Sequence, residues 1–396
     1  MAKVLQTDVV VLGAGAAGMF CAIEAARRGR RVLVLDHATA PGEKIRISGG
    51  GRCNFTNLST APDRFLSENP RFALSALRRF TPADFIARID AAGIAWHEKA
   101  LGQLFCDGSA RQIVALLVRD MAAAGVDLRL GVTVDSLTRT TTGFALHTSA
   151  GAWEAAAVVV ATGGKSIPKM GATGLGYRLA EQFALPLVET RPGLVPLTFG
   201  GALLDRMKEL AGISVAAQVT AGGGSFAEGL LFTHRGLSGP SILQASSYWR
   251  DGGTLSIDLA HGRDVAAALK AQRQSGGKMA VRTALARLVP EQLARQLETA
   301  EGLGDSHLAD LSNAAIDRLA TGIHRWQVKP TGSEGYRTAE VTLGGVATAG
   351  LDARTLQVRT VPGLFFIGEV VDVTGRLGGY NFQWAWSSGW AAGQVA

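Results

Sequence analysis

The sequence predicts an α/β protein in which a doubly wound sheet domain is interrupted by an inserted domain. A β-branched apolar run at residues 8–12 leads into a glycine motif at 13–18 and a helix-like segment, and a second apolar run ends at Asp36. This β–α–β order is typical of a Rossmann-like sheet. From about Arg191 the pattern changes to short β-like runs and then to helix-like segments, and strand-like runs return after residue 335.

The first domain is expected to consist of two separated parts of the chain. These parts are residues 1–190 and 336–396, with the inserted domain at 191–335. The insertion is expected to have a β-rich part at 191–260 and a helical part at 264–325, with a break at Gly276–Gly277. Because single hydrophobic cores stop growing at roughly 250–300 residues, a chain of 396 residues favours such a division.

The composition indicates a folded protein with a basic bias. Hydrophobic residues make up 47% of the chain and charged residues 18%, which allows a large core, so disorder is not the default expectation. The net charge is +7, and residues 27–79 hold eleven Lys or Arg against four Asp or Glu. Such a region suits a dinucleotide, a nucleic acid or an acidic substrate, and a solvated basic face is the simpler alternative.

The cysteines and the N-terminal segment restrict the class of protein further. Cys21, Cys53 and Cys106 are too few and too far apart for a disulfide framework or a zinc site, so no metal is expected. The start of the chain lacks the anatomy of a signal peptide, and no apolar stretch reaches the roughly 18 residues of a membrane span. We therefore expect a cytoplasmic protein without membrane contact, and no stable protein partner is implied.

The glycine motif at 13–18 has the context of a dinucleotide site. Gly13, Gly15 and Gly18 fit G-x-G-x-x-G between a strand and a helix, and Asp36 ends the next strand. Glycine at these positions permits a tight turn, close approach of backbone N–H groups to a pyrophosphate, and close packing of helix on sheet. Asp36 is placed to accept hydrogen bonds from ribose hydroxyls, which argues against a 2′-phosphate there.

Two later stretches favour FAD over NAD as the bound dinucleotide. Residues 160–164 end a buried strand in small residues, and Gly368–Glu369 follow a strand near the C-terminus. In this order the two elements resemble the flavoproteins with two dinucleotide-binding domains, although Glu369 stands where Asp is commoner. No second G-x-G-x-x-G motif follows a strand. NAD(P)H is therefore expected only as a transient donor, without a domain of its own.

Two glycine-rich segments complete the expected cofactor site. The segment 42–57, GEKIRISGGGRCNFTN, places cations and a thiol around three glycines, which suits close contact with a cofactor. Gly378–Gly379 precede an apolar helix, whose N–H groups would stabilise negative charge on a flavin.

The same segments resemble the BaiN/RdsA family of FAD-dependent oxidoreductases. The resemblance rests on 42–57 together with FTHRGLSGP, VTLGGVA, IGEVVDVTG and GGYNFQWAWSSG, and it extends from residue 9 to about 392. It implies a FAD-binding Rossmann-like domain of glutathione-reductase type, interrupted by a domain with a β-barrel-like part and a helical part. It also implies reduction of carbon–carbon double bonds, in substrates that range from bile-acid intermediates to a uridine in ribosomal RNA. Cys106 stands where many members have proline, which suggests a subgroup.

The residues expected to bind the cofactor come from all of these motifs. They are Gly13, Gly15, Ala16, Ala17, Gly18, Asp36, Lys44, Arg46, Ser48, Gly51, Arg52, Val134, Ala161, Thr162, Gly163, Gly368, Glu369, Gly379, Tyr380 and Asn381.

Three side chains are candidates for the chemistry itself. Cys53 is the leading proton donor, and the neighbouring Lys44 and Arg52 are expected to lower its pKa and favour the thiolate. Cys106 is the second thiol candidate, and His234, in the inserted domain, is a candidate substrate-binding group or general acid. All three also have a simpler interpretation, the two cysteines as packing residues and His234 as a turn residue.

Three functions remain open at this stage. The main interpretation is a FAD-dependent reductase of a carbon–carbon double bond in a small molecule, with NAD(P)H as the electron donor. The second is an RNA-modifying flavin reductase that converts uridine to dihydrouridine. The third is a non-catalytic FAD-binding redox sensor that acts through Cys53.

Overall fold

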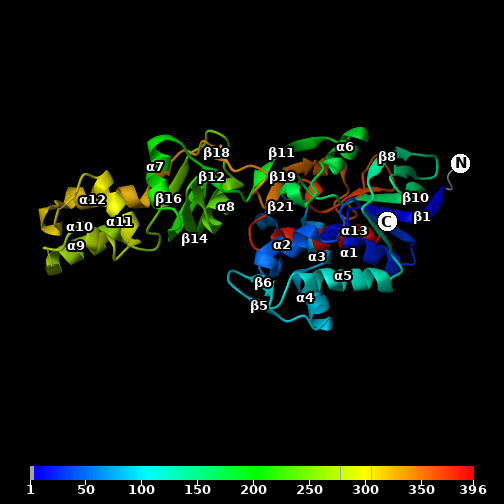
Figure 1. Cartoon of the computed structure of the whole chain (residues 1–396), viewed down its shortest axis with the longest axis horizontal. Helices are drawn as coiled ribbons and strands as arrows, with labels where there is room; N and C mark the ends of the chain where they lie inside the picture. The colour runs from blue at the N-terminus through cyan, green and yellow to red at the C-terminus, as the bar shows by residue number, and fades with distance from the viewer. Residues whose placement is uncertain (1–3, 277, 305) are drawn as a thin grey trace. The chain divides into compact units, whose positions relative to one another are not determined.

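The computed structural model describes residues 4–276, 278–304 and 306–396 (Figure 1). The chain forms two compact units, one made of Met1–Arg191 with Val341–Ala396 and the other of Pro192–Glu340.

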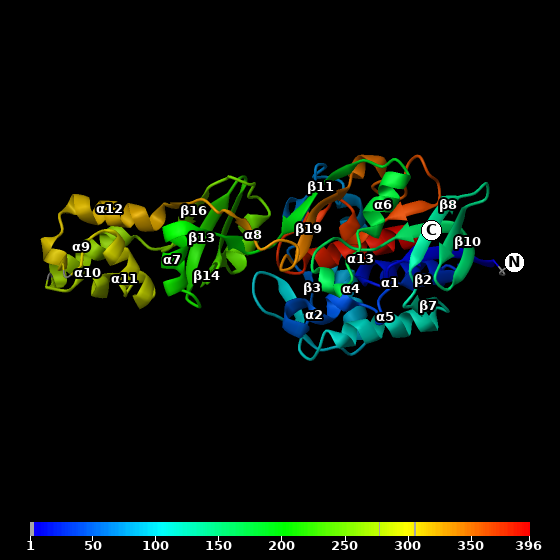
Figure 2. The same cartoon turned by 45° about the horizontal axis from the view of Figure 1, so that its top comes forward.

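The larger unit is built on one seven-stranded sheet (Figure 2). Its strands are β1 (Leu5–Leu12), β2 (Val32–Asp36), β7 (Asp127–Leu130), β8 (Val134–Arg139), β9 (Phe144–Thr148), β10 (Gly151–Val160) and β20 (Leu364–Phe366). The order is β7-β2-β1-β10-β9-β8, and β20 also pairs with β10. The pairs that involve β1, β2, β7 and β20 are parallel, whereas β8, β9 and the first half of β10 form an antiparallel meander. The parallel strands therefore end at a common edge, where their following loops meet.

Helices cover this sheet. They are α1 (Ala16–Arg27), α3 (Leu74–Arg79), α4 (Pro82–Ala91), α5 (Arg111–Ala123), α6 (Leu175–Gln182) and α13 (Tyr380–Gly393). The helices α1 and α13 approach closely because glycines face the contact: a Cβ at Gly389 would lie 2.6 Å from the carbonyl oxygen of Ala17. The buried Trp384 and Trp386 fill the space between α13 and its neighbours. The C-terminal helix is thus part of the first domain's core.

Smaller elements surround the edge where the parallel strands end. They are α2 (Glu43–Gly51), the sheet β3-β6-β5 (Asn54–Asn57, Gln103–Cys106, Trp96–Glu98), the pair β4–β21 (Phe65–Leu66, Thr374–Gly375) and the pair β11–β19 (Leu187–Gly193, Val341–Val346). The predicted strand pair near 94–105 is present as β5 and β6. The segment 42–57 is not a continuous loop, because it contains α2 and β3.

The smaller unit combines one sheet with two groups of helices. The sheet runs β17-β16-β13-β14-β15-β12-β18 (Trp326–Val328, Leu255–Asp258, Ser214–Ala221, Gly224–Thr233, Gly236–Ser238, Leu197–Thr198, Gly332–Ser333). The helices are α7 (Gly201–Glu209), α8 (Pro240–Ser246), α9 (Val265–Gly276), α10 (Val281–Leu285), α11 (Glu291–Ala300) and α12 (Asn313–His324). Within this unit α9 to α12 gather at one end (Figure 2), and a single hydrophobic cluster joins them to the sheet. The expected break at Gly276–Gly277 includes Gly277, which lies outside the described residues.

Short 3-10 helices connect several of these elements. They are η1 (Pro62–Arg64), η2 (Pro168–Met170), η3 (Leu308–Asp310), η4 (Thr348–Gly350) and η5 (Gly368–Val370). None of the helices in the described part of the chain has the length and apolar character needed to cross a bilayer.

Candidate cofactor site and active site

The first glycine motif forms a tight turn between β1 and α1. Gly13 has φ +113°, and a Cβ there would lie 2.4 Å from the carbonyl oxygen of Ala161, so a side chain cannot be accommodated. A Cβ at Gly18 would lie 2.0 Å from the carbonyl oxygen of Gly13. Around Gly15, by contrast, no atom lies within 4 Å of such a Cβ. Gly15 is also the N-cap of α1 and provides no side-chain cap, so the first N–H groups of the helix can bind an anion.

Asp36 is fixed at the end of β2, beside this turn. Its Oδ2 accepts a hydrogen bond of 2.7 Å from the backbone N–H of Ala14, and its Oδ1 accepts one of 2.8 Å from that of Ala38. The backbone N–H of Val132 donates to the carbonyl oxygen of Asp36 at 2.9 Å. The chain then enters β8 at Val134, so the expected residues Asp36 and Val134 lie on adjoining segments.

The segment 42–57 packs against the first glycine turn. The N–H of Gly42 donates to the carbonyl oxygen of Ala14 at 2.9 Å. The helix α2 is interrupted at Ser48 (ψ 148°), and the Oγ of Ser48 donates to the carbonyl oxygen of Ile45 at 2.8 Å. Gly49, Gly50 and Gly51 then all have positive φ, a conformation that favours glycine. No atom lies within 4 Å of a Cβ built at Gly50 or Gly51, so one face of this turn is open.

The three cations of the segment have different partners. The Nζ of Lys44 lies 2.7 Å from Oε2 of Glu369. Arg46 is ion-paired with Glu43 in the preceding turn of α2. Arg52 is exposed and, among the described residues, forms no ion pair. Lys44 and Arg46 are therefore already neutralised by protein carboxylates, which leaves Arg52 as the cation with free charge.

The Lys44–Glu369 pair is the centre of a polar network that sequence reasoning missed. Nζ of Lys44 also donates to Oγ of Ser166 at 2.6 Å, and Oγ of Ser166 donates to Oε1 of Glu369 at 3.0 Å. The backbone N–H of Thr342 donates to the same Oε1 at 2.9 Å. Burial favours the protonated carboxyl, yet Lys44 and these hydrogen bonds outweigh burial and hold the pKa of Glu369 below its ordinary value. The sequence feature that could have identified Ser166 as a site residue is its position just after the buried strand β10 and the glycines that follow this strand.

The C-terminal motif lies against β3. A Cβ at Gly379 (φ +93°) would lie 2.3 Å from the carbonyl oxygen of Thr56. The Nδ2 of Asn57 donates to the carbonyl oxygen of Gly378 at 2.8 Å. Gly379 is the N-cap of α13 and, being glycine, provides no side chain to cap the helix. The segment 42–57 and the start of α13, far apart in sequence, therefore meet.

Asn381 and Tyr380 serve the shape of this motif. The amide of Asn381 accepts from the N–H of Gly375 at 2.8 Å and donates to its carbonyl oxygen at 2.9 Å. Tyr380 is buried, and its ring makes an edge contact with Phe65 at 6.1 Å between centroids. Both side chains thus hold the turn that precedes α13.

The remaining expected residues lie on the same edge of the sheet. Gly163 follows β10, and a Cβ built on it would lie 3.9 Å from Oε2 of Glu369. A Cβ at Gly368 would lie 2.9 Å from that of Ala17 in α1. Ala161 donates its N–H to the carbonyl oxygen of Leu12 at 2.9 Å. The glycine turn, the β10 loop and the η5 loop are therefore in direct contact.

Cys53 departs from the sequence expectation. The expectation that nearby cations lower its pKa is wrong, because the thiol is fully buried and burial raises its pKa to about 12. Its backbone has φ +51°, an uncommon conformation for a residue with a side chain. Cys106 is buried on the neighbouring strand β6, with its pKa raised to about 11 by burial. All three cysteines are unpaired.

His234 belongs to the smaller unit. It is exposed in the turn that joins β14 to β15. Its neighbour Arg235 lies 4.0 Å from Glu334, measured from Nη1 to Oε2. The cofactor-binding candidates, in contrast, all come from the larger unit.

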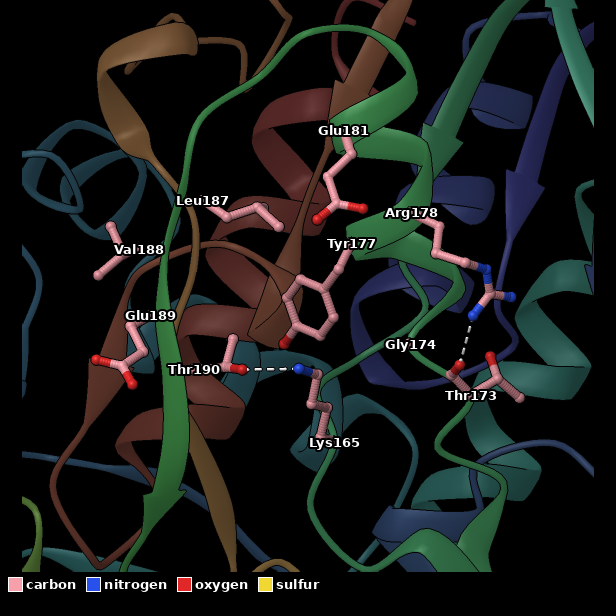
Figure 3. A pocket seen from close by; sticks show the side chains of 10 residues that line it. All are labelled: Lys165, Thr173, Gly174, Tyr177, Arg178, Glu181, Leu187, Val188, Glu189 and Thr190. Carbon is pink, nitrogen blue, oxygen red and sulfur yellow. Dashed lines mark hydrogen bonds between the residues drawn. The ribbon is translucent and has the colours of Figure 1, made fainter.

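A pocket of about 400 Å³ lies beside the β10 loop (Figure 3). Lys165 Nζ donates to Oγ1 of Thr190 at 2.8 Å, a bond drawn in Figure 3, and it lies 5.2 Å from the centre of the Tyr177 ring. Glu181 and Glu189 balance the charges of Lys165 and Arg178 in its lining. A lining without formal net charge does not favour a pyrophosphate, so we do not assign the cofactor to this pocket. In the described residues no group of three or more His, Cys, Asp or Glu is arranged to hold a metal ion.

Comparison with known proteins identifies the family. Residues 7–395 match the HI0933-like protein Rossmann domain. The chain belongs to this family. The family groups FAD-binding Rossmann proteins of the BaiN/RdsA type, so the predicted resemblance and the predicted α/β Rossmann-like fold are confirmed. This member is accordingly a flavoprotein oxidoreductase.

Two curated relatives match this chain over nearly its whole length. The Ribosomal RNA dihydrouridine synthase of Escherichia coli (strain K12) is 50% identical over 388 residues, which is 98% of this chain and 97% of that protein. The 3-dehydro-bile acid delta(4,6)-reductase of Clostridium scindens is 29% identical, over 98% of each chain.

A solved structure supports the fold alone. The 3-ketosteroid-delta4-(5alpha)-dehydrogenase of Rhodococcus jostii RHA1 aligns with a TM-score of 0.50 at 18% identity, covering 98% of this chain and 97% of that chain.

Proposed function

We propose that this protein is a ribosomal RNA dihydrouridine synthase, which reduces the carbon–carbon double bond of a uridine ring with electrons from NAD(P)H. The observation that carries the proposal is the 50% identity, over 98% of this chain, to a protein with that name. The bile-acid reductase is only 29% identical, so the reduction of a small molecule is the weaker candidate. The RNA alternative therefore replaces the small-molecule substrate as the first choice.

The residues at this edge of the sheet fit FAD. The N-termini of α1 and α13 carry no side-chain caps from Gly15 and Gly379, and the positions of Gly15, Gly50 and Gly51 leave open space that a side chain would fill. Asp36 is held beside the first of these helix ends, where it can accept from ribose hydroxyls. We propose that this edge of the sheet binds FAD, which when bound supplies hydride to carbon.

The remaining expected residues surround this cradle. Backbone N–H groups at the start of α1 would bind the pyrophosphate, and those at the start of α13 would stabilise negative charge on the ring. Arg52, the cation with free charge, is available to a phosphate of the cofactor or of RNA. Lys44 and Glu369 position the loops around the cradle through their ion pair.

Cys53 is the proposed proton donor. A thiol with a pKa of about 12 is protonated at neutral pH, which is the form that an acid must have before it gives its proton to carbon. Its left-handed backbone conformation, next to the open glycine turn, is a further reason, because strained residues cluster at functional sites. His234, on the smaller unit, remains a candidate for substrate binding or as a general acid.

The burial of Cys53 disfavours the redox-sensor interpretation. Sensor cysteines are accessible and have a low pKa, because the thiolate is the species that reacts with oxidants. Cys53 is 0% exposed and has a raised pKa. Both roles need access to the thiol, so it is the raised pKa, which keeps the thiol protonated, that favours proton donation over reversible oxidation.

The proposal is tested on the purified protein loaded with FAD. We would incubate it with NADH or NADPH and with ribosomal RNA from a strain that lacks this gene, and quantify nucleosides by mass spectrometry. Formation of dihydrouridine that requires enzyme and donor is the expected result. Absence of dihydrouridine, together with steady turnover of a steroid enone, would favour the small-molecule interpretation instead. A difference between NADH and NADPH in the rate of flavin bleaching identifies the donor.

A further inference from the structure

We propose, on the basis of the proposed function, that the turn between β5 and β6 carries an apolar wedge for RNA. Leu101 at the tip of this turn would insert between bases of the substrate and hold the target uridine out of its stack. The wedge is defined here as Leu101 together with the adjoining Leu58.

The two leucines of the wedge are unusually exposed. Leu101 is 65% exposed and Leu58 is 52% exposed, the two highest values among the large hydrophobic side chains of the described residues. Their backbone segments are neighbours, because the N–H of Leu58, in the loop after β3, donates to the carbonyl oxygen of Gly102 at 2.9 Å. Single exposed leucines need no explanation, but two on neighbouring loops that are hydrogen-bonded to each other place apolar surface at one site.

The wedge is held rigidly in an unfavourable conformation. Leu101 has φ +53°, in the left-handed region that leucine rarely adopts. Its carbonyl oxygen accepts from Nδ2 of Asn57 at 3.2 Å, and the N–H of Gly102 donates to Oε1 of Glu98 at 3.0 Å. The N–H of Lys99 donates to the carbonyl oxygen of Gln103 at 3.0 Å, which closes the turn. A strained residue that is fixed from several sides indicates a function at the tip.

The same asparagine connects the wedge to the proposed flavin site. Nδ2 of Asn57, which is only 1% exposed, donates both to Leu101 and to the carbonyl oxygen of Gly378 at 2.8 Å. Gln103, which follows the turn, lies against Gly378, where a built Cβ would be 3.0 Å from its side chain. The tip is therefore fixed relative to the start of α13, so a base held there stays in register with the cofactor.

Two exposed cations near the wedge favour a nucleic acid as its partner. Lys99 is exposed with its Nζ 5.5 Å from the centre of the Phe105 ring, and Arg52 is exposed near the glycine turn that Phe105 contacts. Glu98 is exposed as well, and its Oε1 accepts the hydrogen bond from the N–H of Gly102. An apolar tip flanked by cations suits base stacking with phosphate contacts. Two leucines are too small an area for a stable protein interface, which needs on the order of 1,000 Å².

Reduction of a uridine in folded RNA requires that the base first be extruded from its stack. The double bond of a stacked base is covered on both faces, so an enzyme must extrude the base, and unstacking costs a few kcal/mol. A side chain that takes the place of the extruded base recovers part of that free energy. A short unstructured RNA has no stack to open and so makes little use of the wedge.

The test compares Leu101→Asn with the control Val395→Asn. Asparagine tolerates the left-handed conformation, so the first variant removes the apolar contact while it keeps the turn. Val395 is 40% exposed and follows α13 at the end opposite to Gly379, roughly 20 Å along the helix. We expect Leu101→Asn to lower the ratio of kcat/KM on folded ribosomal RNA to kcat/KM on oligouridine by roughly tenfold or more. The control is expected to leave this ratio unchanged. An unchanged ratio in Leu101→Asn, or equal losses on both RNAs, would overturn the wedge.

A binding measurement separates this proposal from the proposed function. An RNA hairpin with 2-aminopurine next to an internal uridine becomes more fluorescent when its stack opens. The wedge predicts an increase on binding of wild-type protein and of Val395→Asn, and a much smaller increase with Leu101→Asn. If wild-type protein binds the hairpin without an increase, the wedge is wrong, whatever the turnover. If fluorescence rises but no RNA gains dihydrouridine, the reaction assignment fails and the wedge stands.

Discussion

The two glycine turns of the larger unit, 13–18 and 49–51, differ in what surrounds them. Side chains at Gly13 or Gly18 would collide with the protein's own backbone at 2.4 and 2.0 Å. Side chains at Gly50 or Gly51 would meet no atom within 4 Å. The first turn is therefore glycine-rich largely because helix and sheet pack closely, whereas the second is glycine-rich because of its left-handed backbone and its open face. The division holds for single glycines and not for whole motifs, because Gly15 of the first turn is also open, whereas a Cβ at Gly49 of the second would lie 2.8 Å from the Phe105 ring.

The largest expected effect is from a side chain in the packed turn. Gly13→Ala places a Cβ against Ala161 at a φ of +113°, so overpacking and backbone strain act together. We expect the free energy of unfolding to fall by about 3–5 kcal/mol and FAD to be lost. Thermal melting with and without added FAD measures both effects. Retention of wild-type stability would show that the turn is not packed as described.

The second prediction concerns the thiol at the end of the open turn. Cys53→Ala is expected to lower the rate of dihydrouridine formation on the order of 100-fold, because a general acid contributes about that much. The rate of flavin reduction by NAD(P)H should stay within a factor of about two, since that step requires no proton from this group. Cys106→Ala, which removes an equally buried thiol from the neighbouring strand, is the control. Equal losses in both variants would mean that packing, not proton donation, is affected.

The third prediction uses the ion pair that links α2 of the open turn to the η5 loop. Because its pKa is lowered in the folded protein, Glu369 contributes stability above its ordinary pKa of 4.5, and that stability is lost as the pH falls through the lowered value. Lys44→Met removes the cation, so burial dominates and the acid transition moves to higher pH. The expected loss at neutral pH is about 1–2 kcal/mol, between the exposed and buried limits for ion pairs.

Acid titrations of flavin release measure this shift. Lys165→Met is the control, because Lys165 bonds to Thr190 and not to Glu369. A transition at the same pH in Lys44→Met and in wild-type protein would contradict the role of the pair.

The smallest expected effect separates strain from ligand contact in the open turn. Gly50 and Gly93 have nearly equal φ values, +66° and +67°, and both have open surroundings. Alanine at either position therefore carries the same backbone penalty, about 1–2 kcal/mol. If the open turn faces the cofactor, Gly50→Ala weakens FAD binding and Gly93→Ala leaves it unchanged. Equal FAD affinities in the two variants would show that the open face has no ligand role.

The sequence by itself determined the parts that depend on local pattern and spacing. The apolar run, the glycines and Asp36 define β1, α1 and β2, because strand and helix periodicity and turn chemistry are properties of neighbouring residues. The motifs distributed from residue 9 to 392 likewise indicated the family that the comparison identified. These features needed no knowledge of which distant segments meet.

Only the tertiary structure decided the partners and the protonation of the site. Lys44 and Glu369 are 325 positions apart in the sequence. Asn57 contacts Leu101 at the tip of the β5–β6 turn and also Gly378, which lies 321 positions after Asn57. The sequence placed cations beside Cys53 and so predicted a lowered pKa, yet the folded chain buries the thiol completely, and desolvation depends on everything packed around it. Neighbours in the chain determine local conformation, whereas burial and pairing are fixed by segments that approach through space.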